Sequence, residues 1–248
     1  MNCFKQITLL LLVLMLVGCS LSVERKNQAK SHYTLGLSHM QTGSPTMALK
    51  ELLQAAKIDS GDAEIQAALA QAYQAKKAYS EAQKHYLRAL EISGNDPRYQ
   101  NNLAALYIDM EEWDKAIDYF DRAVGNLLFM RTEVALTGKG YAYFRKGDYP
   151  AAISAYQEAK VIAPGFAPIS LRLGEVFYEL GQDNSARLEF EKALAQSPNY
   201  LEAHYRLGLV YLREKSHSKA AEQFRQVAEL SPESEWGQQS VSFLKTLP

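Results

Sequence analysis

Histidines and clustered carboxylates often carry catalysis or bind metals, but in this 248-residue chain they form no pattern with a chemical use. The histidines are His32, His39, His85, His204 and His217. None has a possible metal ligand four residues later in the chain or a cysteine nearby, as a metal site would need. The chain also lacks a G-x-S-x-G motif, a glycine-rich phosphate loop and H-E-x-x-H. We therefore predict no catalytic residue, no metal, no cofactor and no small-molecule substrate.

One residue does suggest chemistry, because Cys19 stands at the end of an apolar run. Residues 7–17 contain ten apolar residues out of eleven, and Lys5 precedes them. A transmembrane helix needs roughly 20 such residues. An apolar stretch of about 7 to 15 residues behind a positive charge is typical of a secretory signal. The pattern predicts an exported chain in which Cys19 is an attachment point.

The sequence LVGC at residues 16–19 resembles the lipobox of bacterial lipoproteins. The resemblance implies that residues 1–18 are a signal peptide and that the thiol of Cys19 is diacylated. Residues 19–28 would then be the lipidated cysteine and its tether. Two acyl chains give stable anchoring. In that family, Asp directly after the cysteine favours retention in the inner membrane, and this chain has Ser20 there. The resemblance therefore implies a location at the periplasmic face of the outer membrane. The alternatives are an ordinary signal peptide or an uncleaved anchor.

The charge balance excludes several classes of partner. Cleavage would remove Lys5, which leaves 26 basic against 28 acidic residues. It would also remove Cys3, so that no internal disulfide is possible. A nearly neutral chain has no basic face for nucleic acid and no polybasic membrane patch. No nucleic-acid partner is predicted.

The rest of the chain repeats with a period of 34 residues, with two extra residues after the third copy. A small residue recurs as Gly36, Ala70, Ala104, Gly140, Gly174 and Gly208. An alanine follows each after twelve residues, at Ala48, Ala82, Ala116, Ala152, Ala186 and Ala220. A large residue stands four positions further on, at Leu52, Tyr86, Phe120, Tyr156, Phe190 and Phe224. Small residues allow two helices to approach closely, and the large ones fill the space beside them.

This pattern resembles the tetratricopeptide repeat, a 34-residue helix–turn–helix unit. The resemblance implies an all-α fold, an α-solenoid of six stacked repeats at residues 29–62, 63–96, 97–130, 133–166, 167–200 and 201–234. Residues 235–248 depart from the repeat, but they carry apolar residues at helical spacing and predict a capping helix. The alternative is a disordered tail.

In that family, ligands lie along a concave groove formed by the first helix of each repeat. The resemblance implies a partner-binding groove containing Tyr33, Leu37, Met40, Asn101, Tyr141, Phe144, Tyr178, Tyr205 and Leu209. Basic residues are sparse at these positions, which disfavours a clamp for a terminal carboxylate. The apolar and tyrosine-rich walls favour an amphipathic helix or an extended segment with hydrophobic anchors. Alternatively, individual residues of this set pack between repeats.

The two extra residues fall in the stretch VGNLLFMRTE at residues 124–133. It brings Leu127, Leu128, Phe129 and Met130 together at an irregular joint. One interpretation is that they only extend a helix and pack.

A lipobox followed by six such repeats resembles the type IV pilus pilotins. Two stretches at the opening repeats, LGLSHMQTGSPTMALKELLQAAKID and RYQNNLAALYIDMEEWDKAIDYFDRAV, carry this likeness, including the pair Asn101 and Asn102. The resemblance implies a non-enzymatic outer-membrane lipoprotein that binds subunits of the pilus secretin and promotes their assembly. The main alternative is a lipid-anchored adaptor that recruits peptidoglycan-processing enzymes.

Overall fold

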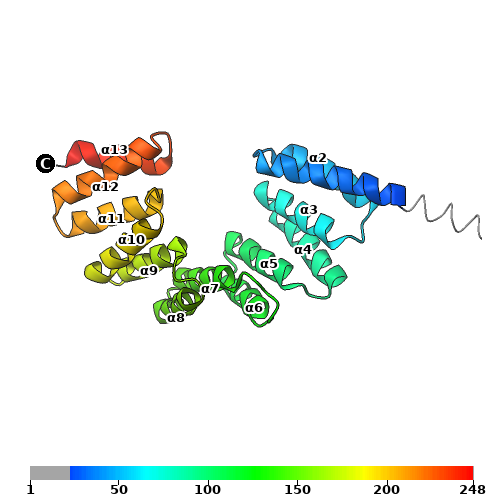
Figure 1. Cartoon of the computed structure of the whole chain (residues 1–248), viewed down its shortest axis with the longest axis horizontal. Helices are drawn as coiled ribbons and strands as arrows, with labels where there is room; N and C mark the ends of the chain where they lie inside the picture. Colours follow the sequence, from blue (N-terminus) through cyan, green and yellow to red (C-terminus); the bar gives the residue numbers. More distant parts are fainter. Residues whose placement is uncertain (1–22, 248) are drawn as a thin grey trace, which may run out of the picture. The chain divides into compact units, whose positions relative to one another are not determined.

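The computed structural model describes residues 23–247, and this part of the chain is helical without a strand (Figure 1). Residues 23–41 form the first described helix. The helices that follow are α2 (Pro45–Ile58), α3 (Ala63–Ala75), α4 (Tyr79–Ser93), α5 (Pro97–Asp109), α6 (Trp113–Val124), α7 (Thr132–Lys146), α8 (Tyr149–Ile162), α9 (Ala167–Glu179), α10 (Asp183–Gln196), α11 (Leu201–Arg213), α12 (His217–Leu230) and α13 (Glu235–Thr246). The predicted all-α class is confirmed.

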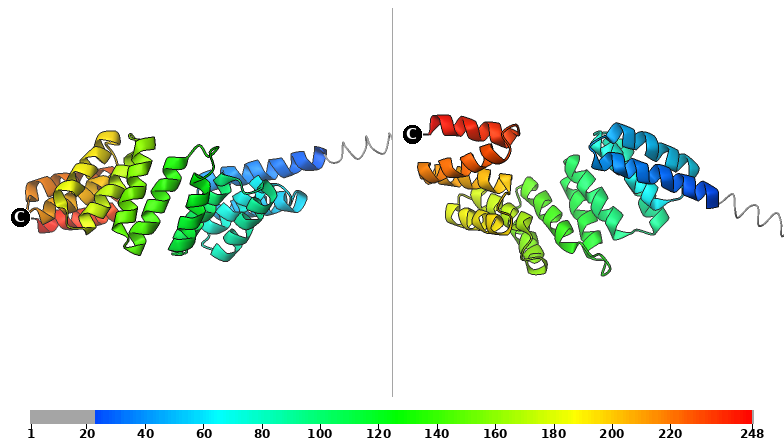
Figure 2. Two further views of the ribbon diagram at one scale, coloured as in Figure 1. Left: turned by 90° about the horizontal axis from the view of Figure 1, so that it is seen from below. Right: turned by 45° about the horizontal axis from the view of Figure 1, so that its top comes forward.

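The chain divides into two compact units, which we call the N-terminal unit, residues 1–111, and the C-terminal unit, residues 112–248. The described part of the N-terminal unit holds the helix at residues 23–41 and α2 to α5, and the C-terminal unit holds α6 to α13. Within each unit, consecutive helices run back and forth as antiparallel neighbours (Figure 2). The division falls between α5 and α6, which are the two helices of the third repeat.

The recurring small and large residues meet inside each helix pair. A Cβ atom on Gly174 would lie 2.5 Å from the ring of Phe190, and one on Gly208 would lie 2.7 Å from Phe224. In the first repeat, the same atom on Gly36 would lie 2.6 Å from Leu52. Real Cβ atoms do not approach so closely, so glycine lets these three helix pairs pack without a shift of the facing side chain, whereas repeats two and three carry alanine at this position. This contact explains the repeat and confirms the α-solenoid.

The turn between the two helices of a repeat always contains one residue with a left-handed backbone. It is glycine in three repeats, at Gly43, Gly147 and Gly181, where φ is 69°, 80° and 71°. The equivalent residues of the other three are Lys77, Glu111 and Lys215, with φ between 58° and 60°. L residues with a Cβ rarely adopt this conformation. The turn geometry is therefore fixed by the fold, and the sequence follows it in only half of the copies.

The predicted capping helix is α13, which packs against α12 and α11. The rings of Phe243 and Phe224 stack 4.8 Å apart, and Trp236 lies 4.6 Å from Tyr205. Ser234 caps the helix by accepting a hydrogen bond from the backbone of Gly237 at 3.0 Å. Residues 235–246 are thus an ordered lid over the last repeat rather than a loose tail.

The N-terminal end differs from the expected tether. Residues 23–28 are helical and continue without a break into the first helix of repeat one. They contain no proline or glycine that would end a helix, and Ala29 directly after them is buried. The proposed signal peptide and Cys19 lie outside the described residues. Among residues 23–247, no helix has the length and apolar character that crossing a bilayer requires.

Candidate partner-binding surface

In the N-terminal unit, the first helices of the repeats form an open hollow. One part, of about 330 Å³, is lined by Lys26, Ala29, Lys30, Tyr33, Asp59, Asp62, Glu64 and Ile65. A second part, of about 190 Å³, is lined by Tyr33, Leu37, Glu64, Ala67, Ala68, Gln71, Arg98, Tyr99 and Asn102. Tyr33 and Glu64 belong to both parts, so we treat them as one site and call it the N-terminal hollow.

Tyr33 lines both parts of the N-terminal hollow and packs against the core beneath it. It is half-buried and packs against the buried residues Ala29 and Ile65. Leu37 and Met40 follow on the same face and pack against the core of the first two repeats. Burial raises the pKa of the Tyr33 phenol, and the carboxylates of Glu64 and Asp62 add to this shift. The phenol therefore stays neutral and offers an apolar ring with one polar end.

Both signs of charge surround the N-terminal hollow. Arg98 pairs with Asp96 at 2.8 Å, and its guanidinium lies 5.3 Å from the centre of the Tyr99 ring. Burial raises the pKa of Tyr99 to about 12. Asn102 lines the hollow rather than the expected Asn101, whose buried Oδ1 atom has no hydrogen-bond partner. The site combines an apolar floor with a balanced charged rim.

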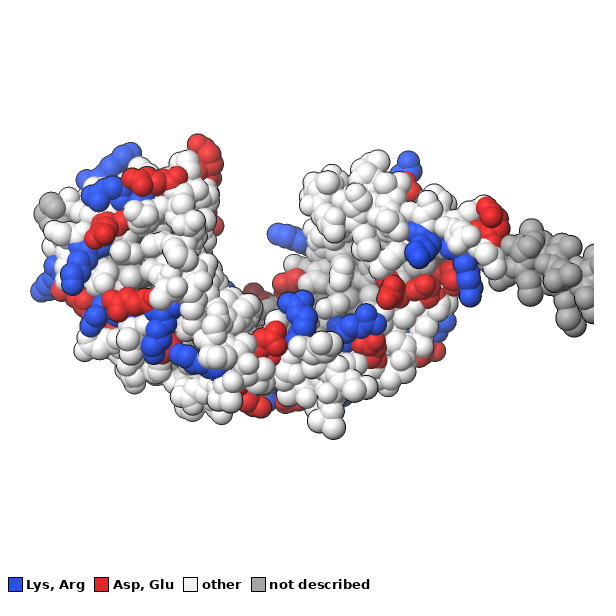
Figure 3. Space-filling view, viewed as in Figure 1, with Lys and Arg blue, Asp and Glu red and all other residues white. Residues whose placement is uncertain are grey.

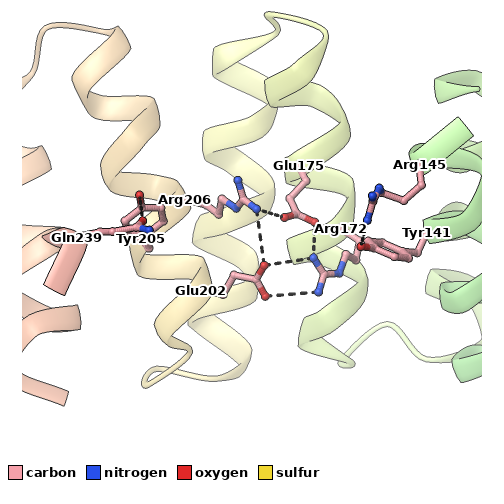
Figure 4. Close-up of polar contacts among 8 residues, drawn as sticks. All are labelled: Tyr141, Arg145, Arg172, Glu175, Glu202, Tyr205, Arg206 and Gln239. Carbon is pink, nitrogen blue, oxygen red and sulfur yellow. Dashed lines mark hydrogen bonds and ion pairs between the residues drawn. The ribbon is translucent and has the colours of Figure 1, made fainter. Parts of the chain in front are cut away.

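In the C-terminal unit, the corresponding face is occupied by an ion-pair network that we call the Arg–Glu lattice (Figure 4). It consists of Arg172, Glu175, Glu202 and Arg206 from α9 and α11. Glu175 accepts from Arg172 at 2.5 Å and lies 2.8 Å from Arg206, while Glu202 lies 3.3 Å from Arg172. Two cations and two anions cancel, so the lattice presents no net charge to a ligand.

The carboxylate at the centre of the lattice is buried, and the other three side chains are partly buried. Glu175 is 5% exposed, and burial raises the pKa of its carboxyl while Arg172 and Arg206 oppose that rise. Burial alone would lower the pKa of Arg172, but Glu175 and Glu202 raise it, and the side chain remains a cation. Charges removed from water are stable only when fully paired. The lattice is therefore a structural joint between repeats five and six.

The predicted aromatic residues of this unit lie beside arginines instead of forming an open apolar wall. The Tyr141 hydroxyl accepts a hydrogen bond from Arg145 at 2.9 Å, and Arg172 lies 5.5 Å from the centre of its ring. Arg213 lies 3.7 Å from the centre of the Tyr178 ring. Phe144 packs against Tyr149 with ring centres 5.8 Å apart. These contacts cover part of each ring that a partner would need.

The prediction that Tyr205 lines an open groove is wrong. Tyr205 is 7% exposed, and its hydroxyl donates to Gln239 of the capping helix at 2.6 Å. Its ring packs against Trp236 and Phe243 of the same helix. Leu209 is also partly buried against the core of the last repeat. The capping helix takes the position that a further repeat or a ligand would have taken.

Sequence reasoning missed the arginines of this face. Arg172 and Arg206 occupy the sixth position of repeats five and six, and Arg145 and Arg213 occupy the thirteenth position of repeats four and six. The residues predicted to line the groove lie at the fifth, ninth and twelfth positions of their repeats. Arginine at the same position of two successive repeats was the signal that could have revealed the lattice.

Three of the five histidines lie in structural pairs. His32 is 2.7 Å from Glu51, His85 is 2.7 Å from Gln66, and His204 is 2.7 Å from Gln223. Each pair joins residues 19 positions apart, one on each helix of a repeat. Within residues 23–247, no group of three metal-binding side chains comes together.

On the face seen in Figure 3, each unit carries both signs of charge. Figure 3 shows basic and acidic side chains interspersed on the visible face of each unit, with no large field of one sign. The surface therefore favours recognition by shape and local apolar contact rather than by long-range attraction.

Solved structures with the same fold include two from pilus biology. A crystal structure of PilW, described as a widely conserved type IV pilus biogenesis factor, is 20% identical with a TM-score of 0.76, covering 86% of this chain and 98% of PilW. Pseudomonas aeruginosa PilF is 18% identical with a TM-score of 0.71, covering 88% of this chain and 99% of PilF. At these identities the likeness establishes the fold.

Among curated proteins, the Hsp70-Hsp90 organizing protein of Triticum aestivum is 25% identical over 166 residues, or 63% of this chain. The corresponding protein of Plasmodium falciparum is 33% identical over 91 residues, or 35% of this chain. The chain spans about a quarter of the length of the wheat protein, 27%.

Family models match along most of the array. A model described as TPR repeat matches residues 140–181 and 174–215. Models described as tetratricopeptide repeat match residues 39–106, 101–127 and 201–234. The matched segments, the helix pairs and the contacts between small and large residues agree, and the chain belongs to the tetratricopeptide repeat family.

Proposed function

We propose that this chain is a lipid-anchored periplasmic scaffold that acts as a pilotin, carrying subunits of the type IV pilus secretin to the outer membrane and promoting their assembly. The observation that carries the proposal is a match in fold over nearly the full length of PilW, 98% of that chain. The lipobox at residues 16–19 supplies the expected membrane address. Proteins of this repeat family are generally interaction modules, and binding of a protein partner is the function they share.

The N-terminal hollow is the proposed recognition site. Tyr33 and Leu37 supply an apolar surface, and Arg98 and Glu64 line the same hollow as polar partners. Buried aromatic residues at the centre of an interface commonly contribute 2 kcal/mol or more. An amphipathic helix or extended segment with one or two large apolar side chains fits this arrangement. Because the rim charges balance, binding should depend little on salt.

The proposal is tested by capturing partners from membranes with the full chain, with crosslinking and identification of the bound proteins. We expect secretin subunits with the native chain and their loss with the variant Tyr33→Ala/Leu37→Ala. The matched control is Met47→Ala/Leu53→Ala, which removes two exposed apolar residues of α2. Recovery of peptidoglycan-processing enzymes instead would favour the adaptor function. Capture of secretin by both variants would contradict the proposed site.

The anchor is tested separately with Cys19→Ser. We expect the variant to leave the membrane fraction or to remain unprocessed, while its circular dichroism stays that of the native array. Mass spectrometry of the native N-terminus should show a diacylated cysteine. An unmodified Cys19 would contradict the anchor and leave the binding site to be judged by the capture experiment.

A further inference from the structure

The loop between α6 and α7 displays three large apolar side chains to solvent. Leu127 is 100% exposed, Leu128 is 87% exposed and Met130 is 93% exposed. Phe129, in the middle of the sequence, turns inward and is 8% exposed. We call Leu127, Leu128 and Met130 the apolar tip. The alternative that these residues only pack therefore holds for Phe129 alone.

The loop that carries the apolar tip is built as an ordered turn. The backbone N–H of Leu128 donates to the side chain of Asn126 at 2.9 Å, and that of Phe129 donates to the backbone oxygen of Asn126 at 3.0 Å. The hydroxyl of Thr132 donates to the backbone oxygen of Phe129 at 2.9 Å. These bonds satisfy backbone groups inside the loop. A segment that enters a bilayer needs its backbone N–H and C=O groups to be hydrogen-bonded within the protein.

The charged residue nearest to the apolar tip in the sequence is a cation, Arg131. Residues 122–132 contain Arg122 and Arg131 and no acidic residue. The nearest preceding acids are neutralised: Asp121 lies 2.6 Å from Lys139, and Asp118 lies 2.7 Å from Arg122. Glu133 follows in the first turn of α7. Arg131 is thus the one charge within residues 125–131, and its sign suits the phosphates of a bilayer surface.

The shape of this feature distinguishes a bilayer from a protein partner. A side chain exposed at 100% has no wall beside it, so the apolar tip projects from the helix ends and is not a groove. The loop lies at one end of the α6–α7 pair (Figure 2). A protein partner would need a pocket shaped for three such side chains, whereas the acyl region of a bilayer accepts them without one. The proposed lipid on Cys19 would hold the chain beside such a surface.

We propose that Leu127, Leu128 and Met130 insert into the interface of a phospholipid bilayer, with Arg131 at the headgroups, and form a second membrane contact for the C-terminal unit. Removal of each of these apolar side chains from water is favourable. The contact is too small to hold the protein on its own but sufficient to orient a chain that is already anchored. The inference rests on the proposed anchor only for the nearness of a bilayer.

The experiment supplies its own tether, so that it does not depend on Cys19. A chain beginning at Ser20 contains every described helix and no cysteine. It is given an N-terminal hexahistidine tag and held on vesicles of phosphatidylethanolamine and phosphatidylglycerol that contain a nickel-chelating lipid. A polarity-sensitive fluorophore is attached at Leu128→Cys. The matched control carries the fluorophore at Val161→Cys, a residue at the end of α8 that is 84% exposed.

We expect the emission of the label at position 128 to shift to the blue and to be quenched several-fold more by brominated lipid than the label at position 161. Adding Leu127→Ser and Met130→Ser should remove most of that quenching, with unchanged circular dichroism. The proposal is overturned if the label at position 128 stays as exposed to water as the control label. It is also overturned if that label responds only when a secretin subunit is added, because the apolar tip would then be a protein contact. The comparison of the two labels on vesicles needs no secretin, so its failure can be told apart from a failure of the proposed function.

Discussion

The face formed by the first helices of the repeats differs between the two units. In the N-terminal unit it leaves an open hollow around Tyr33, with its charged residues at the rim. In the C-terminal unit it is closed by the Arg–Glu lattice and by the capping helix over Tyr205. One repeat architecture therefore produces a surface that can receive a ligand and a surface that joins its own repeats. The residues at two or three positions of each first helix decide between them.

The largest expected difference in stability comes from the lattice. Glu175→Ala leaves Arg172 and Arg206, both partly buried, with only Glu202 as a counter-charge, which should cost about 3 kcal/mol in the free energy of unfolding. Glu64→Ala, in the N-terminal hollow, removes an exposed carboxylate and should cost about 0.5 kcal/mol or less. Urea denaturation of both variants measures the contrast. Equal losses in the free energy of unfolding would contradict the proposed difference between the structural lattice and the open hollow.

The close contacts between helices should also differ between the units. Gly174→Ala places a methyl group against the ring of Phe190, and overpacking of this kind costs roughly 1–3 kcal/mol, more than the gain in helix propensity. Gly36→Ala meets Leu52, whose smaller side chain can yield more easily, so the loss should be smaller. Gly165→Ala, which meets no atom within 4 Å, is the control and should be nearly neutral. A thermal midpoint unchanged in Gly174→Ala would contradict the packing described for repeat five.

Acid should loosen a second ion-pair joint of the C-terminal unit. Glu189 accepts hydrogen bonds from Lys160 and Lys192, both at 2.7 Å. Burial works in the opposite direction, but these bonds hold the pKa of Glu189 below its usual value of 4.5. A depressed folded pKa means that this stabilisation is present above about pH 4.5 and is lost as the pH falls through the folded pKa. Glu189→Gln should therefore cost about 1 kcal/mol at pH 7, and the difference from the native chain should shrink below pH 4. A difference that is constant with pH would contradict the ion pairing.

Substitutions in the turn between the two helices of a repeat should have the smallest effect on the free energy of unfolding. The effect should be equal in the two units, because both contain this turn. Lys77→Gly and Lys215→Gly place glycine where φ is 59° and 60°. Each should raise the free energy of unfolding by about 0.5–1 kcal/mol, because glycine adopts this conformation without a Cβ clash. Gly181→Ala is the inverse control and should destabilise. Chemical denaturation of the three variants tests whether the turn imposes its geometry equally on both halves.

The sequence was sufficient for the fold because each repeat encodes the same local contact. The pairs Gly174–Phe190 and Gly208–Phe224 lie 16 residues apart, and the period alone revealed them. The exposure of the groove residues was harder to predict, because it depends on side chains that lie outside the same repeat. Tyr205 has the spacing of a groove residue, yet Trp236 and Gln239 of the capping helix cover it. Likewise, Arg172 becomes a joint only through Glu202, 30 residues later in the next repeat.

The exposed loop shows the same limit. Its composition placed four apolar residues at the joint, but nothing in the spacing distinguished Phe129 from its neighbours. The hydrogen bond from Leu128 to the side chain of Asn126 sets the turn that directs Phe129 inward and the others outward. The amide that forms such a turn is a local signal, whereas the direction of each side chain depends on the two helix ends.

The central claim is that a partner binds at the N-terminal hollow and not at the corresponding face of the C-terminal unit. The most direct measurement is calorimetric titration of a purified secretin subunit into the native chain and two double variants. Tyr33→Ala/Leu37→Ala should weaken the affinity by about 30-fold or more, the equivalent of about 2 kcal/mol. Tyr141→Ala/Phe144→Ala should change the affinity less than about threefold, because Arg145, Arg172 and Tyr149 already contact those two rings within the protein. A larger loss from the second variant than from the first, with both folded, would contradict the account.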